Sequence, residues 1–280
     1  MKIGVLGSGT MGNGIAQAFA NAGLQVVLCD IDSDKLSQAS ETIRGNLTRI
    51  FKKQGKELSE VNNIIANIIY TTDKNVLSDN DVIIEAIVEN MDIKKKVFAE
   101  LDALCEEKTI IASNTSGLSI TELAAATNRA DRVIGMHFFN PVPVMNLVEL
   151  IRGSETADAT YERAKELVNI IGKESISVLD APLFIVNRIL VPMLNEAMFV
   201  FGEGIATAED IDKGMMLGAN HPIGPLALAD LIGLDTLLSV AETLFQETGD
   251  SKYRVPPILK KQVRAGNLGR KSGKGFYEYK

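Results

Sequence analysis

Two apolar stretches in the middle of the chain each carry one residue that could take part in proton transfer. His137, one of two histidines, ends the stretch 132–137, and Glu149 lies within the stretch 147–151. A carboxylate between apolar neighbours needs a partner if it is buried, and a histidine is a suitable one. Such a pair would orient the imidazole and stabilise its protonated form, so the ring could act as general acid and base. Two other interpretations remain open: His137 as a satisfied core residue, and Glu149 as a sheet-edge residue facing water.

A glycine-rich motif near the N-terminus has the spacing of a dinucleotide-binding turn. It joins an expected strand over 3–6 to an expected helix over 13–22. In such a turn Gly7 would permit the tight bend, Gly9 would let the backbone approach a pyrophosphate, and Gly12 would let strand and helix pack closely. The predicted contacts with the dinucleotide are Gly7, Gly9, Thr10, Met11 and Gly12. A turn that merely packs, without a ligand, is the alternative.

Asp30 ends the second expected strand, about 20 residues after the motif, where a carboxylate can accept hydrogen bonds from both ribose hydroxyls. The same charge would repel a 2′-phosphate, and the neighbouring Ile31 and Asp32 offer no arginine for one. These residues favour NAD over NADP. A flavin would need similar glycines, and Asp30 could instead be a strand-end cap, so the motif alone leaves the cofactor open.

The elements that must position these residues follow an alternating pattern. From residue 2 to about 178, short β-branched stretches alternate with helical ones, which is typical of a mostly parallel sheet covered by helices. The expected strands cover 3–6, 25–29, 68–71, 82–86, 109–113, 132–137, 147–151 and 175–178. The sequence therefore predicts an α/β fold of the Rossmann type, in which strand ends such as His137 face the ligand crevice.

The domain organisation is indicated by an insert after the second expected strand and by a change from strands and helices to helices alone after Pro182. Residues 33–67 carry apolar positions at helical spacing and predict a helix, a break near Gly55 and a second short helix. After Pro182 the strands stop, and helices are expected over 184–202, 207–218, 225–229, 234–248 and 256–264. We therefore expect an NAD-binding domain over 1–182, with its helical insert at 33–67, and an all-helical domain over 183–280.

Composition excludes several classes of protein. The 280 residues carry a formal net charge of −7, which argues against nucleic-acid and membrane-surface binding, because phosphate backbones select clustered cations. Two isolated cysteines indicate neither a zinc site nor a disulfide framework. No stretch is long and apolar enough for a membrane span, and the N-terminus lacks the pattern of an export signal. A cytoplasmic protein is expected.

Three further runs carry a resemblance to a known family. Residues 112–116 (ASNTS), 135–145 (GMHFFNPVPVM) and 269–277 (GRKSGKGFY) resemble the 3-hydroxyacyl-CoA dehydrogenase family, above all its stand-alone bacterial members that act on 3-hydroxybutyryl-CoA. The resemblance implies that His137 is the general acid/base and Glu149 its partner. It implies that Ser116 and Asn187 hydrogen-bond the substrate oxygens. Ser116 could equally be a helix N-cap, with Ser119 nearby.

The resemblance also implies contacts with the nicotinamide half of the cofactor, from Glu89, Lys94, Asn140 and Lys271. For Lys94 a solvated helix face is the alternative, because Lys95 and Lys96 stand beside it. His221 lies in a turn-rich stretch between expected helices, where a structural or N-cap role is the expected one.

A CoA substrate requires cations for its phosphates, and the acidic chain concentrates such cations on the helical insert. They are Arg44, Arg49, Lys52, Lys53 and Lys56, of which Lys53 is the best single candidate for substrate binding. An ordinary solvated helix face is the alternative.

The expected activity is the interconversion of a (3S)-3-hydroxyacyl-CoA, such as 3-hydroxybutyryl-CoA, and its 3-oxoacyl-CoA with NAD(H). The resemblance implies a homodimer in fatty acid or butyrate metabolism. Two rivals remain: a dehydrogenase of a free sugar acid such as gulonate, and a non-catalytic NAD-binding protein. The cation cluster favours CoA over the first, and the set Ser116, His137, Glu149 and Asn187 favours an enzyme over the second.

Overall fold

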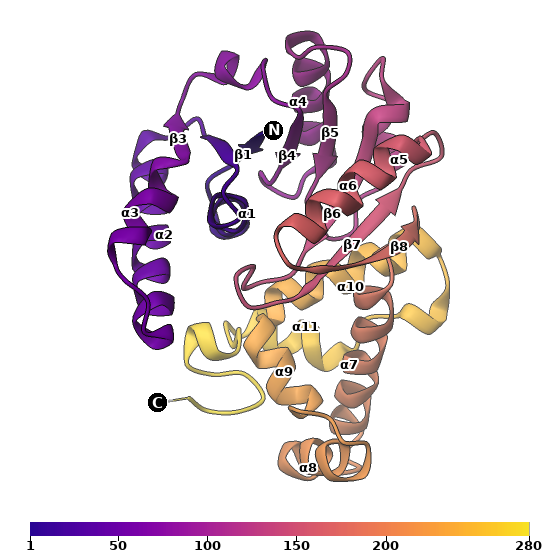
Figure 1. The fold of residues 1–280 in the computed structure, drawn as a ribbon. Helices are drawn as coiled ribbons and strands as arrows, with labels where there is room; N and C mark the ends of the chain where they lie inside the picture. The colour runs from indigo at the N-terminus through magenta and orange to yellow at the C-terminus, as the bar shows by residue number, and fades with distance from the viewer. Residues whose placement is uncertain (280) are drawn as a thin grey trace. The chain divides into compact units, whose positions relative to one another are not determined.

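The computed structural model describes residues 1–279, which form two compact units. The first unit is Met1–Ala181 and the second begins at Pro182. The first is an α/β unit and the second is built from helices (Figure 1). The fold class predicted from the sequence is therefore confirmed.

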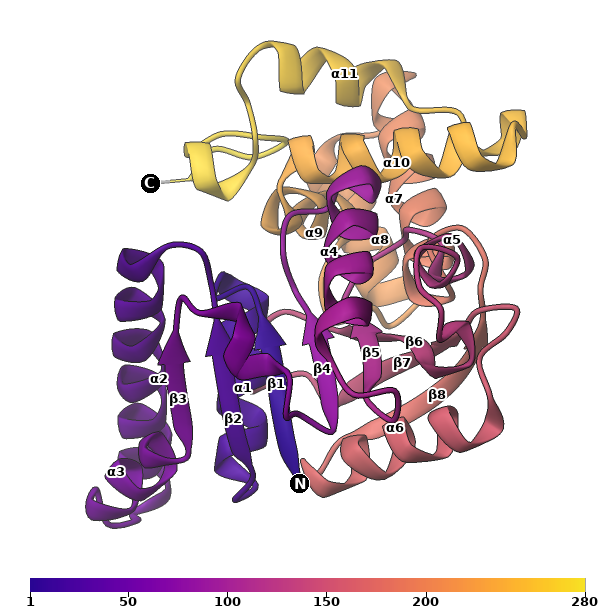
Figure 2. The same cartoon turned by 90° about the horizontal axis from the view of Figure 1, so that it is seen from above.

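The first unit is organised around one eight-stranded sheet. Its strands are β1 (Lys2–Leu6), β2 (Gln25–Cys29), β3 (Ile68–Thr71), β4 (Val82–Glu85), β5 (Ile110–Ser113), β6 (Val133–Phe138), β7 (Leu147–Arg152) and β8 (Glu174–Leu179). They lie in the order β3-β2-β1-β4-β5-β6-β7-β8. Figure 2 shows β3, β2, β1, β4 and β5 side by side. Neighbouring strands are parallel except β6 and β7, which are antiparallel.

Helices cover the sheet because its central strands are apolar on both faces and must be shielded from water. The helices of this unit are α1 (Thr10–Asn21), α2 (Ser33–Gln54), α3 (Ser59–Ala66), α4 (Met91–Leu104), α5 (Ile120–Ala124) and α6 (Asp158–Ile170). One core cluster joins α1, α2, α3 and α6 to the strands, with Phe19, Ile43 and Leu167 among its fully buried members. The helix α4 packs against α5 and buries Phe98 and Leu101.

The insert between β2 and β3 forms two helices, as its periodicity predicted. The side chain of Asp32 caps the N-terminus of α2 by accepting hydrogen bonds from the amides of Asp34 and Lys35. Gly55 ends α2 in the left-handed conformation, with φ of 68°. A residue with a Cβ atom is strained in that conformation, so the glycine sets the break between α2 and α3.

The second unit consists of α7 (Val186–Gly202), α8 (Ala208–Gly218), α9 (Pro225–Ile232), α10 (Leu234–Thr248) and α11 (Pro257–Arg264). Their core includes the fully buried Leu194, Met198, Leu226 and Leu259. Asp230 on α9 accepts hydrogen bonds from the amides of Phe276 and Tyr277, which ties the C-terminal segment to the helices.

Within residues 1–279, no helix is long and apolar enough to cross a membrane. The same residues contain no group of three or more His, Cys, Asp or Glu side chains that could hold a metal ion.

Candidate active site

The glycine motif forms a tight turn between β1 and α1. Gly7 has φ of 103°, and a Cβ atom there would lie 2.5 Å from the carbonyl oxygen of Ala86. A Cβ atom on Gly12 would lie 1.8 Å from the carbonyl oxygen of Gly7, so only glycine permits this approach of helix and turn. Gly9 differs, because a Cβ atom there would meet no atom within 4 Å.

The open space at Gly9 adjoins the N-terminus of α1, whose first helical residues are Thr10 and Met11. Backbone amides at a helix N-terminus attract phosphate groups. The absence of a side chain at Gly9 therefore leaves room for a pyrophosphate against these amides. This turn fits a dinucleotide by its shape and by the kind of hydrogen-bond donors it offers.

Asp30 follows β2 directly and points its carboxylate at the glycine turn. Its Oδ2 accepts hydrogen bonds from the amide of Ser8, at 2.7 Å, and from the Ser8 hydroxyl, at 2.8 Å. Its Oδ1 accepts one from the Asp32 amide at 3.1 Å. Partial burial acts to raise the pKa of Asp30, but these hydrogen bonds outweigh it and hold the pKa below its ordinary value. The carboxylate is thus charged at neutral pH and can accept hydrogen bonds from sugar hydroxyls.

His137 and Glu149 form a pair between neighbouring strands. They occupy opposite positions in the register of β6 and β7, and His137 Nδ1 lies 2.7 Å from Glu149 Oε2. Glu149 is fully buried and His137 is 5% exposed, so the sheet-edge interpretation of Glu149 is wrong. The carboxylate orients the imidazole and can balance a positive charge on it.

Asn114 ties the end of β5 to the histidine strand. Its side-chain oxygen Oδ1 accepts a hydrogen bond from the amide of Phe138, the residue after His137, at 2.9 Å. The His137 ring also packs against Phe139, with ring centroids 4.4 Å apart. These contacts restrict the rotation of the imidazole and hold it at the carboxyl end of β6.

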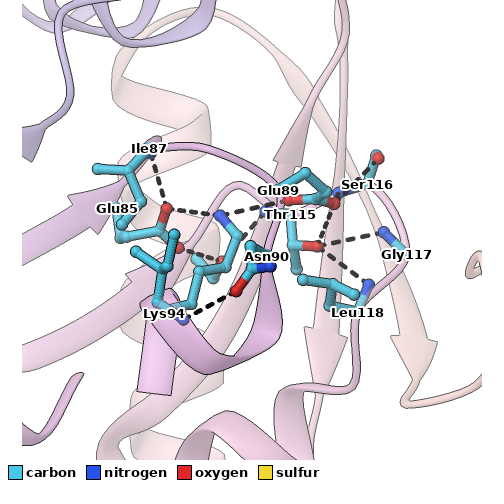
Figure 3. A network of polar contacts seen from close by, with 11 residues as sticks. Glu85, Ile87, Glu89, Asn90, Lys94, Thr115, Ser116, Gly117 and Leu118 are labelled. Atoms are coloured by element: carbon cyan, nitrogen blue, oxygen red, sulfur yellow. Dashed lines mark hydrogen bonds and ion pairs between the residues drawn. The ribbon is translucent and has the colours of Figure 1, made fainter. Parts of the chain in front are cut away.

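Ser116 lies in the loop between β5 and α5, where it contacts Glu89. Glu89 Oε1 accepts hydrogen bonds from the Ser116 amide at 2.8 Å, from the Ser116 hydroxyl at 3.2 Å and from the Thr115 hydroxyl at 2.6 Å (Figure 3). The N-cap of α5 is Ser119, whose hydroxyl accepts from the Glu122 amide. The N-cap interpretation of Ser116 is therefore wrong.

Lys94 is buried in the first turns of α4, with 1% of its side chain exposed. Its Nζ lies 2.6 Å from Glu85 Oε1 and 3.3 Å from Glu89 Oε2. The solvated-face interpretation of Lys94 is therefore wrong, although it holds for Lys96, which is exposed. The structure thus brings together Ser116, Glu89 and Lys94.

Glu85, the last residue of β4, is a buried residue of this region that the sequence did not identify as a candidate. It is fully buried and accepts hydrogen bonds from the Ile87 amide, the Lys94 ammonium and the Ser113 hydroxyl. Its position in the sequence indicates burial, because Glu85 directly follows three apolar residues in the stretch Val82–Glu85. A carboxylate in that position requires a partner, by the reasoning that singled out Glu149.

The loop after β6 carries Asn140, which is exposed and precedes a cis peptide bond to Pro141. Lys173, just before β8, holds this loop by donating from Nζ to the carbonyl oxygens of Val142 at 2.7 Å and Met145 at 2.6 Å. Burial lowers the pKa of Lys173. A Cβ atom on Gly14 of α1 would lie 2.9 Å from Val142, so the loop also packs closely on the helix that follows the glycine turn.

The remaining expected residues lie on other elements. The cations Arg44, Arg49, Lys52, Lys53 and Lys56 are all exposed on α2 and just beyond its end. In the second unit, Asn187 occupies the first turn of α7, and Lys271 Nζ lies 2.7 Å from Asp235 Oδ2. His221 lies in the turn before α9, where its amide donates to the Met215 carbonyl oxygen.

The chain matches known protein families over nearly its whole length. Residues 2–181 match the family described as "3-hydroxyacyl-CoA dehydrogenase, NAD binding domain", and residues 184–279 match "3-hydroxyacyl-CoA dehydrogenase, C-terminal domain".

Individual relatives match this chain over 90% or more of their own length. The 3-hydroxybutyryl-CoA dehydrogenase of Clostridioides difficile is 50% identical over 100% of this chain and 99% of its own. The mitochondrial hydroxyacyl-coenzyme A dehydrogenase of Homo sapiens is 42% identical over 99% of this chain and 90% of its own. The crystal structure of (S)-3-hydroxybutyryl-CoA dehydrogenase from Ralstonia eutropha superposes with a TM-score of 0.97 at 52% identity, over 100% of this chain and 99% of the other.

Proposed function

Because the chain belongs to the 3-hydroxyacyl-CoA dehydrogenase family, an oxidoreductase family with an NAD-binding domain, we propose that it interconverts (3S)-3-hydroxybutyryl-CoA and acetoacetyl-CoA with NAD(H). The names of its full-length relatives support the four-carbon acyl group. The (S) configuration in the name of the Ralstonia eutropha enzyme supports the proposed (3S) configuration of the alcohol.

The observation that carries the proposal is the buried pair of His137 and Glu149 at the end of β6. A carbonyl reduced to an alcohol must gain a proton on oxygen, and an alcohol oxidised to a carbonyl must lose one. An imidazole held by a carboxylate can do both at neutral pH. Because Nδ1 faces Glu149, the proposed proton transfer uses Nε2 of His137.

The other site residues would bind the dinucleotide and the substrate and orient them toward His137. In the proposal the dinucleotide lies on the turn Gly7, Gly9, Thr10, Met11 and Gly12, with its adenosine ribose on Asp30. When bound, the nicotinamide supplies or accepts the hydride at the 3-carbon of the substrate. Its half of the site would be formed by Glu89, Lys94, Asn140 and Lys271. Ser116 and Asn187 would donate hydrogen bonds to the substrate oxygen and so polarise the carbonyl.

The exposed cations of α2 suit the phosphates of CoA. Lys53 and its neighbours carry positive charge on a chain that is acidic overall, and such a local cluster attracts a polyanion. We assign most of the proposed NAD contacts to the first unit and dimerisation to the second. The proposed substrate contacts are Lys53 and Ser116 of the first unit and Asn187 of the second. A cytoplasmic homodimer completes the proposal.

The test is the loss of reduced-nicotinamide absorbance when purified protein is mixed with acetoacetyl-CoA, with NADH and NADPH in parallel. Rapid loss with NADH alone is the expected result. A preference for NADPH would contradict the role given to Asp30. Turnover of a free sugar acid in place of the thioester, or tight binding of NADH with no turnover, would overturn the proposed activity.

A further inference from the structure

Glu85 is a fully buried carboxylate that the proposed mechanism does not use. It stands at the carboxyl end of β4, where its register partners are Leu6, just before the glycine turn, and Ser113, at the end of β5. Its position between the two strand ends that carry the nucleotide turn and Ser116 places it next to both.

Both carboxylate oxygens of Glu85 are engaged. Oε1 accepts from the Ile87 amide at 2.7 Å and from Lys94 Nζ at 2.6 Å, and Oε2 accepts from the Ser113 hydroxyl at 2.7 Å. Hydrogen bonds from three directions hold a carboxylate in one orientation. Glu85 is therefore a rigid anchor.

Lys94 connects this anchor to the residues assigned to ligand binding. Its ammonium donates a hydrogen bond to Glu85 at 2.6 Å and forms a longer ion pair, at 3.3 Å, with the half-exposed Glu89 (Figure 3). Glu89 in turn receives the hydrogen bonds of Ser116 and Thr115. A series of polar contacts thus connects the buried end of β4 to the proposed site, through Glu85, Lys94, Glu89 and Ser116.

The negative charge of Glu85 is what holds Lys94 in its buried position. Buried Lys94 requires a carboxylate, and within residues 1–279 Glu85 and Glu89 contact it. With Glu85 neutralised, Lys94 would be drawn to Glu89 alone. Both side chains proposed to contact the nicotinamide half would then leave their positions.

We infer that Glu85 is a positioning residue for the coenzyme: it holds Lys94, and through Lys94 also Glu89, in the geometry that binds the nicotinamide half. The inference rests on the proposed function. It predicts that the effect of Glu85 on coenzyme binding passes through Lys94 and is separate from its effect on stability.

The test measures NADH affinity from the coenzyme's own fluorescence, together with urea unfolding, for Glu85→Gln, Lys94→Met and the double variant. Lys94→Met leaves buried Glu85 without a counter-ion, and Glu85→Gln leaves buried Lys94 with only the half-exposed Glu89, so each single variant should be destabilised. The double variant removes both charges and should recover stability. NADH binding should weaken about tenfold in Glu85→Gln, and the double variant should bind no more weakly than Lys94→Met.

A matched control is Asp102→Asn, which breaks the buried pair of Asp102 and Arg129 elsewhere in the same unit. It should lose stability and keep wild-type NADH affinity. If Glu85→Gln does not fold, Ser113→Ala replaces it, because it keeps the ion pair of Glu85 and Lys94 and frees Oε2, together with the Thr115 amide that the Ser113 hydroxyl accepts from at 3.1 Å. Ser113→Ala should weaken NADH binding about twofold to threefold.

Three results would overturn the inference. Wild-type affinity in Glu85→Gln, or in Ser113→Ala where that variant replaces it, would remove the role of Glu85. Independent, additive losses from Glu85→Gln and Lys94→Met would remove the route through Lys94. If the double variant recovers NADH affinity together with stability, the pair of Glu85 and Lys94 contributes to folding only and not to coenzyme binding. A wild-type protein that binds no NADH would instead refute the proposed function, and the inference with it.

Discussion

His137 and Glu149 face each other across the antiparallel junction of β6 and β7, with Nδ1 and Oε2 2.7 Å apart. Side chains opposite each other on neighbouring strands share one face of a sheet and lie within direct reach. The reversal of strand direction at this junction therefore places the carboxylate against the ring with no help from a flexible loop.

The first prediction concerns this pair. His137→Ala should lower kcat for acetoacetyl-CoA reduction by about 10² to 10⁴, because it removes the acid/base group, and should leave NADH affinity within about twofold of wild type. Steady-state rates and NADH titration measure the two quantities. Wild-type turnover in His137→Ala would eliminate the histidine as the acid/base.

The second prediction concerns the partner. Glu149→Gln keeps the size of the side chain but removes the charge that balances a protonated imidazole, so kcat should fall at least about tenfold. Because Glu149 acts through His137, the double variant His137→Ala with Glu149→Gln should be no slower than His137→Ala alone. Multiplied losses in the double variant would show that Glu149 acts by another route.

The third prediction uses glycines that differ in their surroundings. Gly9→Ala should fold with wild-type stability, because its Cβ atom meets nothing within 4 Å, yet weaken NADH binding tenfold or more by filling the space proposed for the pyrophosphate. Gly12→Ala should be destabilised, because its Cβ atom would lie 1.8 Å from the Gly7 carbonyl oxygen. Thermal unfolding and NADH titration distinguish the two effects.

Gly45→Ala is the control for that experiment. Gly45 lies within α2 with open space around it, so alanine should stabilise the helix by about 0.5–1 kcal/mol and leave NADH binding unchanged. Unimpaired NADH binding in Gly9→Ala would contradict the placement of the dinucleotide.

The fourth prediction concerns the cations of α2. Lys53→Gln should raise KM for acetoacetyl-CoA about twofold to fivefold, since an exposed charge contributes little more than 1 kcal/mol, and the increase should shrink at high salt. KM for acetoacetyl-N-acetylcysteamine, a thioester without phosphates, should not change. Lys165→Gln on α6, also an exposed lysine, provides the control. Equal effects on both thioesters would exclude a phosphate contact.

The fifth prediction is a pH dependence of stability at Asp102. Burial acts to raise the pKa of this carboxyl, but hydrogen bonds from Asn128 and Arg129 outweigh it and lower the pKa. Because the folded pKa lies below the unfolded one, the stabilisation is complete above the unfolded value near 3.9 and is lost as pH falls through the folded value. Asp102→Asn should therefore be less stable than wild type at pH 7.

Urea unfolding of wild type and Asp102→Asn between pH 7 and pH 3 measures this difference. The gap between the two proteins should narrow only at the acid end of the range. A constant gap, or one that widens toward low pH, would contradict the assigned direction of the shift.

The sequence by itself determined the nucleotide turn, the order of elements, and Asp30 and His137 as residues at strand ends. These features depend on local requirements: a positive φ at Gly7, a side-chain period along each strand, and the position of Asp30 directly after β2. The expected strands coincide with the eight strands of the sheet to within one residue at each end. Local physics was sufficient because burial on both faces of a parallel sheet leaves a continuous apolar signal.

Only the tertiary structure decided which polar side chains are buried together. Lys94, Lys95 and Lys96 are alike in sequence, yet α4 presents Lys94 alone to the interior, where Glu85 and Glu89 receive it. Ser116 and Ser119 are equal candidates for the N-cap of α5 until the fold sets Ser116 against Glu89. Such choices depend on the direction of a helix and on charges far apart along the chain, because a buried charge is stable only where a distant element brings its partner.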